Sequence, residues 1–129
     1  MSNVRCRILC IDDHKDSAEM LQLLLSHEDY EVSIATSISE ALQLATSEIF
    51  DLFVLDRRLP DGSGVELCRQ LHVVAAGVPC IFYSGDAYEL HRQQALDAGA
   101  EGYVSKPNIE ALIDAVVKLL AGRECAATG

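Results

Sequence analysis

Near the start of the chain stands the stretch RILCIDD, Arg7–Asp13, in which a short apolar run ends at two aspartates. A nearly continuous apolar run of this length is typical of a parallel strand that is buried on both faces. Four further runs of similar size follow along the chain, of which only the first is more polar. The five predicted strands are Arg7–Ile11, Glu31–Ala35, Leu52–Leu55, Cys80–Ser84 and Gly102–Ser105.

Between these runs, apolar residues recur at spacings of three and four, which is the pattern of an amphipathic helix. The five predicted helices are Ser17–His27, Ile38–Ala45, Gly64–Val74, Glu89–Ala98 and Asn108–Leu120, the last with Asn108 as its cap. Strands that alternate with helices predict an α/β fold, a doubly wound five-stranded parallel sheet with five helices. The expected strand order is 2-1-3-4-5, with right-handed crossovers.

The composition indicates one compact domain, because 129 residues that are 50% hydrophobic can bury a core without metals or disulfides. We expect this domain to span residues 1–121 and interpret residues 122–129 as a tail or the start of a removed linker. The formal net charge of −10 argues against direct binding of nucleic acid or of a membrane surface. No stretch is typical of a signal peptide or a spanning helix, so we expect a cytoplasmic protein.

The cysteines are odd in number and include no CxxC pair: Cys6, Cys10, Cys68, Cys80 and Cys125. This pattern favours neither a disulfide framework nor a zinc knuckle. We therefore expect reduced thiols, with Cys10 and Cys80 buried in strands as small hydrophobic residues.

Charged and hydroxyl residues stand at the ends of four predicted strands. Asp12 and Asp13 follow the first strand, Asp56 follows the third, Ser84 ends the fourth and Lys106 follows the fifth. Ligands of doubly wound sheets bind beyond the carboxyl ends of the strands, at the switch point between the first and third. We therefore expect these five side chains to meet at one rim.

Three carboxylates at one point repel each other, and they either raise a pKa or require a cation. Oxygen ligands that leave room for a phosphate fit Mg²⁺. Asp12 and Asp13 have an alternative role as a turn with a helix-capping acid. Asp56 is harder to explain in that way, because burying a lone carboxylate costs several kcal/mol.

A carboxylate such as Asp56 beside Mg²⁺ can attack phosphorus in line and form an aspartyl phosphate. The charge of Lys106, the hydroxyl of Ser84 and backbone N–H groups around Gly85 would neutralise its oxygens. Considered singly, Ser84 could be an ordinary turn residue and Lys106 a solvated lysine. Their shared rim favours the functional interpretation.

The set Asp12-Asp13, Asp56, Ser84-Gly85 and Lys106-Pro107 resembles bacterial two-component response-regulator receiver domains. The resemblance covers Arg7 to roughly Leu120, is to a single-domain receiver like the chemotaxis regulators, and implies a flavodoxin-like fold. The loop DRRLPDGSG, Asp56–Gly64, also resembles the acceptor loop of the family, with Leu59 where methionine is commonest.

The resemblance implies a role for each residue of the set. Asp56 would be the phospho-acceptor, and Ser84 and Lys106 would grip the phosphoryl group. Asp12, Asp13, Asp56 and the backbone carbonyl of Arg58 would bind Mg²⁺. A cis peptide bond between Lys106 and Pro107 is also implied. Tyr103 would be a switch aromatic that turns inward when Ser84 moves, or else a plain strand aromatic.

The implied activity is that of a signalling switch in a two-component phosphorelay, which catalyses its own phosphorylation and dephosphorylation but is not otherwise an enzyme. A histidine kinase or a histidine phosphotransfer protein would donate the phosphoryl group to Asp56. The surface around the fourth and fifth helices would then change and bind a target or a second copy of the chain. The downstream target, and whether an output domain belongs to the same protein, stay open.

Arg58 and Asp86 each lie two residues beyond a residue of the set, which places them at the mouth of the expected site. They are either unrelated surface charges, worth at most ~1 kcal/mol as a pair, or a lid that hinders hydrolytic water. In the second case the phosphoryl group should be lost slowly.

Three other functions are disfavoured by particular residues. A haloacid-dehalogenase phosphatase needs Asp-x-Asp, whereas Asp56 is followed by Arg57 and Arg58. A flavin-binding module needs a Ser/Thr/Gly-rich loop that binds the flavin phosphate, and no loop after a predicted strand has that composition. An inert scaffold would be expected to have lost one of the acidic pair, the acceptor or the lysine.

Overall fold

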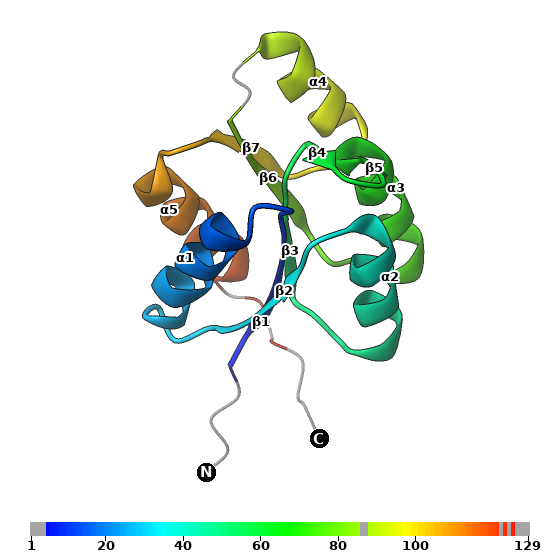
Figure 1. Cartoon of the computed structure of the whole chain (residues 1–129). Helices are drawn as coiled ribbons and strands as arrows, with labels where there is room; N and C mark the ends of the chain where they lie inside the picture. Colours follow the sequence, from blue (N-terminus) through cyan, green and yellow to red (C-terminus); the bar gives the residue numbers. More distant parts are fainter. Residues whose placement is uncertain (1–4, 86–87, 122, 124, 126–129) are drawn as a thin grey trace.

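The computed structural model describes residues 5–85, 88–121, 123 and 125. A five-stranded parallel sheet lies at its centre, in the order β2-β1-β3-β6-β7 (Figure 1). The strands are β1 (Arg7–Ile11), β2 (Glu31–Ala35), β3 (Leu52–Leu55), β6 (Cys80–Ser84) and β7 (Gly102–Ser105). All five have the predicted bounds. Because β4 (Arg58–Leu59) and β5 (Gly62–Ser63) form a separate antiparallel hairpin, this order is the predicted 2-1-3-4-5.

The described chain has the five predicted helices, of which four connect strands and the fifth follows β7: α1 (Lys15–Ser26), α2 (Ile38–Ser47), α3 (Gly64–Val74), α4 (Glu89–Asp97) and α5 (Ile109–Leu120). Helix α1 begins at Lys15 rather than Ser17, and α2 continues to Ser47 rather than ending at Ala45. The predicted cap of α5 is confirmed, because Asn108 Oδ1 accepts the N–H of Ala111 at 3.2 Å.

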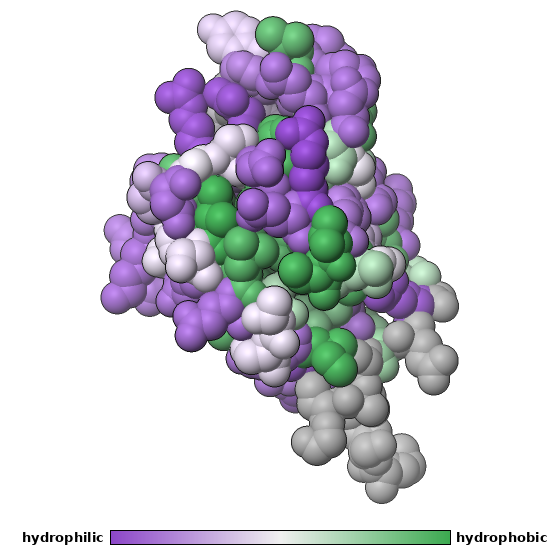
Figure 2. Space-filling model, turned by 90° about the vertical axis from the view of Figure 1, so that its right-hand side faces the viewer, coloured by the Kyte–Doolittle hydropathy of each residue, from purple (hydrophilic) through white to green (hydrophobic). Residues whose placement is uncertain are grey.

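The sheet divides the interior into two hydrophobic layers. Helices α1 and α5 cover one face, and α2, α3 and α4 cover the other (Figure 1). Along β3, Leu52 and Val54 enter the first layer, whereas Phe53 and Leu55 enter the second, since successive strand residues point to opposite faces. On the side covered by α2 and α3, hydrophobic residues gather in the middle and the α4 end is mostly hydrophilic (Figure 2).

The expectation of five reduced thiols is wrong for one pair. Cys6, just before β1, and Cys125, beyond α5, are joined by a disulfide across 119 sequence positions. The two Cα atoms lie 5.0 Å apart, a proximity that comes from the packing of α5 on the sheet and leaves no pattern in the sequence. Cys10, Cys68 and Cys80 are free and buried, as predicted for Cys10 and Cys80.

Nowhere in the described chain is a helix both long and apolar enough to cross a membrane.

The hairpin β4–β5 turns the chain sharply after the end of β3, where a simple loop was expected. The turn brings Gly64, the first residue of α3, against the backbone of Asp56, and the N–H of Gly64 donates to the Arg57 carbonyl at 2.7 Å. A Cβ atom on Gly64 would lie 3.0 Å from the Asp56 carbonyl carbon and closer still to its oxygen. The absence of a side chain at Gly64 therefore allows α3 to start here.

Replacing Gly64 with alanine should lower the free energy of unfolding by about 1–3 kcal/mol, the usual cost of forcing extra volume into a packed site. Urea unfolding followed by circular dichroism measures the change. Gly85→Ala is the matched control, since an added Cβ at Gly85 has no described neighbour within 4 Å, and it should change stability by less than about 0.5 kcal/mol. A Gly64→Ala protein as stable as the parent would contradict the close approach.

Candidate functional site

A cleft of about 760 Å³ opens beyond the carboxyl ends of the parallel strands. The loops that follow β1, β3, β6 and β7 line it. Of the predicted residues, the lining includes Asp13, Asp56, Arg58, Ser84 and Lys106. Asp12 is not itself a lining residue, but it contacts Lys106, which is one. The structure thus brings the predicted set together at one rim.

Lys106 joins the two buried aspartates of this rim. Its Nζ lies 2.7 Å from Asp12 Oδ2 and 3.3 Å from Asp56 Oδ2. Asp12 and Asp56 are only 6% and 8% exposed, so either carboxylate would be costly without a partner. One lysine after β7 therefore forms ion pairs with carboxylates at the ends of both β1 and β3, and its single charge compensates only part of theirs.

The ionisation of Asp12 and Lys106 follows from this contact. Burial raises the pKa of the Asp12 carboxyl, but hydrogen bonds from Lys106 and His14 outweigh burial and hold the pKa below its usual value. Burial likewise lowers the pKa of Lys106, but the hydrogen bond to Asp12 and the charge of Asp56 raise it overall. Both groups are therefore charged at neutral pH.

The carboxylate oxygens at this rim suit a hard divalent cation. Asp12, Asp13, His14 and Asp56 each place one ligand atom so that all four lie within 4.8 Å of one another. Three carboxylates against one lysine leave negative charge uncompensated, and carboxylate oxygens are the ligands that Mg²⁺ prefers. The residues therefore fit a Mg²⁺ site.

His14 was not among the predicted site residues. Its Nδ1 lies 3.2 Å from an oxygen of Asp12 and 3.2 Å from an oxygen of Asp13, and its N–H donates to Asp12 at 2.9 Å. His14 is also the residue that precedes the first turn of α1. The early start of α1 brings it to the rim, which a helix predicted to begin at Ser17 did not suggest.

The backbone around Lys106 fixes its direction. The Lys106–Pro107 peptide bond is cis, which confirms the prediction. The N–H of Lys106 donates to the carbonyl of Ser84 at 2.8 Å, so the pairing of β6 with β7 continues past the end of the strands. On the other side of the cleft, Asp56 Oδ1 accepts the N–H of Arg57 at 2.7 Å.

Ser84 and Tyr103 lie on neighbouring strands. Ser84 is 4% exposed and lines the cleft together with Gly85. The half-buried ring of Tyr103 stacks on Phe82, two residues before Ser84, with ring centroids 5.9 Å apart and an angle of 17°. This packing is compatible with a plain strand aromatic and with a switch aromatic, so the role of Tyr103 in a switch stays a prediction.

Of the two residues expected at the mouth of the cleft, only Arg58 is among the described residues. Arg58 is exposed and lines the cleft from β4. Asp86 lies outside the described residues, so the pairing of Arg58 with Asp86 stays a prediction. The role of the Arg58 carbonyl as a metal ligand also stays a prediction.

Asp61, at the tip of the hairpin after Asp56, makes a contact that no sequence pattern predicted. Its two carboxylate oxygens accept the N–H groups of Ile38 at 2.8 Å and Ser39 at 3.0 Å. These hydrogen bonds, that of Ile38 first, lower the pKa of Asp61. An acid in a loop can cap any helix start that lies near in space, but the sequence carries no signal for which helix that is.

The model of the response regulator receiver domain matches residues 8–117 of this chain. The response regulator ArlR of Staphylococcus epidermidis is 35% identical over 107 residues, which cover 82% of this chain and 48% of that protein. The chain spans about half the length of the curated relatives it matches.

Solved structures agree with this match. A two-component response regulator from Clostridium difficile superposes with a TM-score of 0.87 at 28% identity, covering 92% of this chain and 98% of that one. A response regulator from Burkholderia pseudomallei, solved with a phosphorylated aspartic acid, calcium and citrate, has a TM-score of 0.80 at 27% identity, covering 96% of this chain and 77% of that one.

The fold, the acidic rim with its lysine and the cis peptide bond after β7 thus agree with the family that the sequence resembles. Members of this family accept a phosphoryl group on an aspartate and serve as signalling proteins. The chain belongs to the response regulator receiver domain family.

Proposed function

We propose that the chain accepts one phosphoryl group on Asp56, from a histidine kinase or a histidine phosphotransfer protein. The contact that carries this proposal is that of Lys106 Nζ with both Asp12 and Asp56. It places the carboxylate that would be the acceptor beside a positively charged side chain, in a cleft that is open to a donor. Residues 1–121 would form the receiver unit, and residues 122–129 a tail or linker. The chain would act as a switch rather than as an enzyme on other substrates.

Each residue of the rim would have its own role in phosphoryl transfer. An oxygen of Asp56 would bond to phosphorus as the bond from the donor breaks, and Lys106 would move its charge from the carboxylates to the phosphoryl oxygens. Ser84 would donate its hydroxyl to the same oxygens. Mg²⁺, held by Asp12, Asp13, Asp56 and the Arg58 carbonyl, would compensate the charge that one lysine leaves.

Acetyl phosphate should label the protein once, and only with Mg²⁺ present, whereas Asp56→Asn should remain unlabelled because it lacks the acceptor oxygen. Intact-mass analysis after a timed incubation measures the label. Asp114→Asn is a suitable control, since this carboxylate pairs with Lys118 on the surface of α5 and should be labelled like the parent. Labelling that persists in Asp56→Asn, or that continues after a chelator has removed Mg²⁺, would show that Asp56 is not the Mg²⁺-dependent phospho-acceptor.

The lifetime of the phosphorylated state is proposed to depend on the cleft mouth. Arg58 is exposed beside the acceptor, and in this proposal it meets Asp86 and hinders the in-line approach of water. If this contact raises the activation barrier for hydrolysis by about 0.7 kcal/mol, hydrolysis of the aspartyl phosphate slows about threefold.

Arg58→Ala and Asp86→Ala should each speed loss of the phosphoryl group by about threefold, and the double variant should add little to either. Decay is followed by phosphate-affinity gel after removal of the donor. Arg69→Ala serves as the control, because Arg69 pairs with Glu66 on the surface of α3. Unchanged lifetimes in both single variants would leave Arg58 and Asp86 as surface charges.

The response to phosphorylation is proposed to be a shift between two existing conformations. Ser84 and Tyr103 lie on β6 and β7, whose ends lead into α4 and α5. A hydroxyl drawn toward the phosphoryl group would leave space beside Phe82, and the Tyr103 ring would turn inward. A target, or a second copy of the chain, would then bind the changed surface.

Beryllofluoride with Mg²⁺, standing in for the phosphoryl group, should shift backbone amide signals across Glu89–Val117, which spans α4, β7 and most of α5. Two-dimensional amide NMR of the isotopically enriched protein records the shifts. Asp56→Asn under the same conditions should show none. Spectra of the parent that stay unchanged across this range would show the proposed switch to be wrong.

A further inference from the structure

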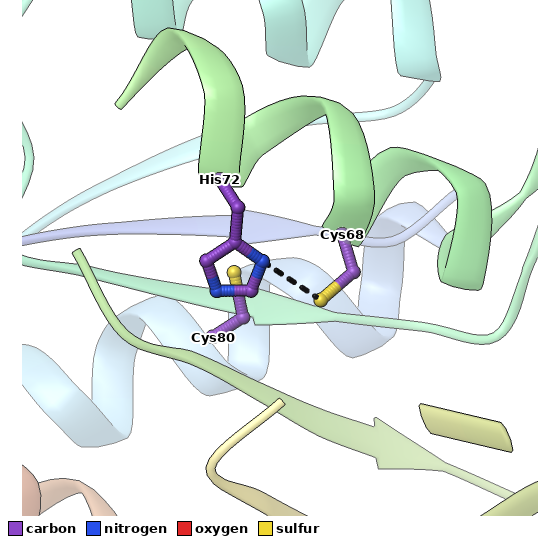
Figure 3. Close-up of side chains that lie close together, drawn as sticks. All are labelled: Cys68, His72 and Cys80. Carbon is purple, nitrogen blue, oxygen red and sulfur yellow. Dashed lines mark hydrogen bonds between the residues drawn. The ribbon is translucent and has the colours of Figure 1, made fainter. Parts of the chain in front are cut away.

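A second cluster of potential metal ligands lies on the α2, α3 and α4 face of the sheet, away from the cleft. Cys68 and His72 of α3 and Cys80 of β6 turn their side chains toward one another (Figure 3). One ligand atom from each lies within 4.8 Å of the other two. Cys68 Sγ and His72 Nδ1 are 3.8 Å apart.

The secondary structure holds these three residues in place. Cys68 and His72 are one helical turn apart and so lie on the same face of α3. Cys80 opens β6, where it pairs with Phe53 of the central strand. Ser84 ends the same strand, so at about 3.3 Å per residue the cluster is ~13 Å from the phosphorylation cleft. The two sites are therefore separate.

The end of α4 closes the cluster. Gly99 follows α4 with a φ of +102°, and a Cβ there would lie 2.9 Å from His72 Cε1 and 3.2 Å from Nδ1. The His72 ring therefore occupies space that a side chain at position 99 would fill. The carbonyl of Ala98 lies 3.7 Å from Cys68 Sγ and accepts from its thiol.

The sulfur atoms are inaccessible, whereas the ring is only half-buried. Cys68 and Cys80 are both 0% exposed. A hydrogen bond between the two thiols lowers the pKa of Cys68 and raises that of Cys80. Buried cysteines often serve as small hydrophobic residues. Here, however, a half-buried imidazole places a ring nitrogen 3.8 Å from Cys68 Sγ and a ligand atom within 4.8 Å of Cys80 Sγ, which ordinary core packing does not require.

We propose that Cys68, His72 and Cys80 bind a thiophilic divalent ion of the zinc class. Zn–S bonds of about 2.3 Å and Zn–N bonds of about 2.0–2.1 Å at a tetrahedral angle place S and N about 3.6 Å apart. The observed 3.8 Å between Cys68 Sγ and His72 Nδ1 needs little adjustment. Water would fill the fourth position, on the exposed side of His72.

Charge balance selects a divalent ion. Binding releases the two thiol protons to solvent, and Nδ1 of neutral His72 supplies its lone pair to the metal. Two thiolates, one neutral imidazole and a 2+ ion sum to zero, so the buried site carries no net charge. A monovalent ion such as Cu⁺ would leave a buried negative charge, which is costly. Mg²⁺ prefers oxygen ligands and would stay at the acidic rim.

The test is a Zn²⁺ titration against a chromophoric chelator. It uses the reduced chain of all 129 residues, excess Mg²⁺ and a Cys6→Ser/Cys125→Ser background. That background is needed because Cys6, Asp51 and Cys125 also place ligand atoms within 4.8 Å of one another. We expect one Zn²⁺ per chain. Co²⁺ in its place should give sulfur-to-cobalt charge-transfer absorption in the near ultraviolet.

Cys68→Ser, Cys80→Ser and His72→Gln should each weaken Zn²⁺ binding by at least about tenfold and reduce the Co²⁺ absorption. His72→Gln keeps the test decisive if a buried cysteine variant fails to fold, because the ring is only half-buried. Cys10→Ser, a free cysteine of the opposite layer, should bind like the parent. Asp56→Asn should also bind normally, which separates this proposal from the phosphorylation site. No Zn²⁺ uptake, or uptake that His72→Gln leaves unchanged, would overturn it.

Discussion

The contact of one ammonium group with two buried carboxylates is the constraint on which the functional end of the molecule depends. Lys106 reaches Asp12 and Asp56 from the far side of the cleft, and its own N–H is bonded to the Ser84 carbonyl. This one residue therefore links the ends of four parallel strands, β1, β3, β6 and β7. Without its charge, two nearly inaccessible carboxylates would face each other in a medium that screens them poorly. The cis peptide bond to Pro107 belongs to the same arrangement.

The sequence predicted the parallel sheet and the residues at its rim because both depend on local patterns. Apolar runs such as Leu52–Leu55 have no alternative to burial on both faces, and a polar residue directly after such a run must stand at the strand end. Parallel strands with right-handed crossovers then bring those ends together without any knowledge of side-chain packing. The start of α1 was predicted less well, because residues Asp13–Asp16 are polar and carry no helical stripe.

The contacts that were missed join segments far apart in the chain and follow no period. Asp61 caps α2 across the surface, and Cys6 meets Cys125. Asp51 is another example, since it is 2% exposed and accepts the N–H of Arg7 at 2.8 Å. Each is an ordinary polar or sulfur-containing residue in the sequence, and only the packed fold supplies its partner. The hairpin β4–β5 was also missed, since strands of two residues are too short to show alternation.

The strands of the sheet differ in burial, and this difference determines which of them can move most easily. β3 lies in the middle with every residue buried, whereas β7 is an edge strand whose four residues are only half-buried. The backbone amides of β3 should therefore exchange with solvent only when the whole domain unfolds, while those of β7 can exchange through small local openings. Asp56 follows the fully buried strand β3, and Lys106 follows the half-buried edge strand β7. If Asp56 is the acceptor, as proposed, its phosphorylation would disturb the buried strand β3 little, and the easier movement would be at the sheet edge, where β7 carries Tyr103 and leads to Lys106.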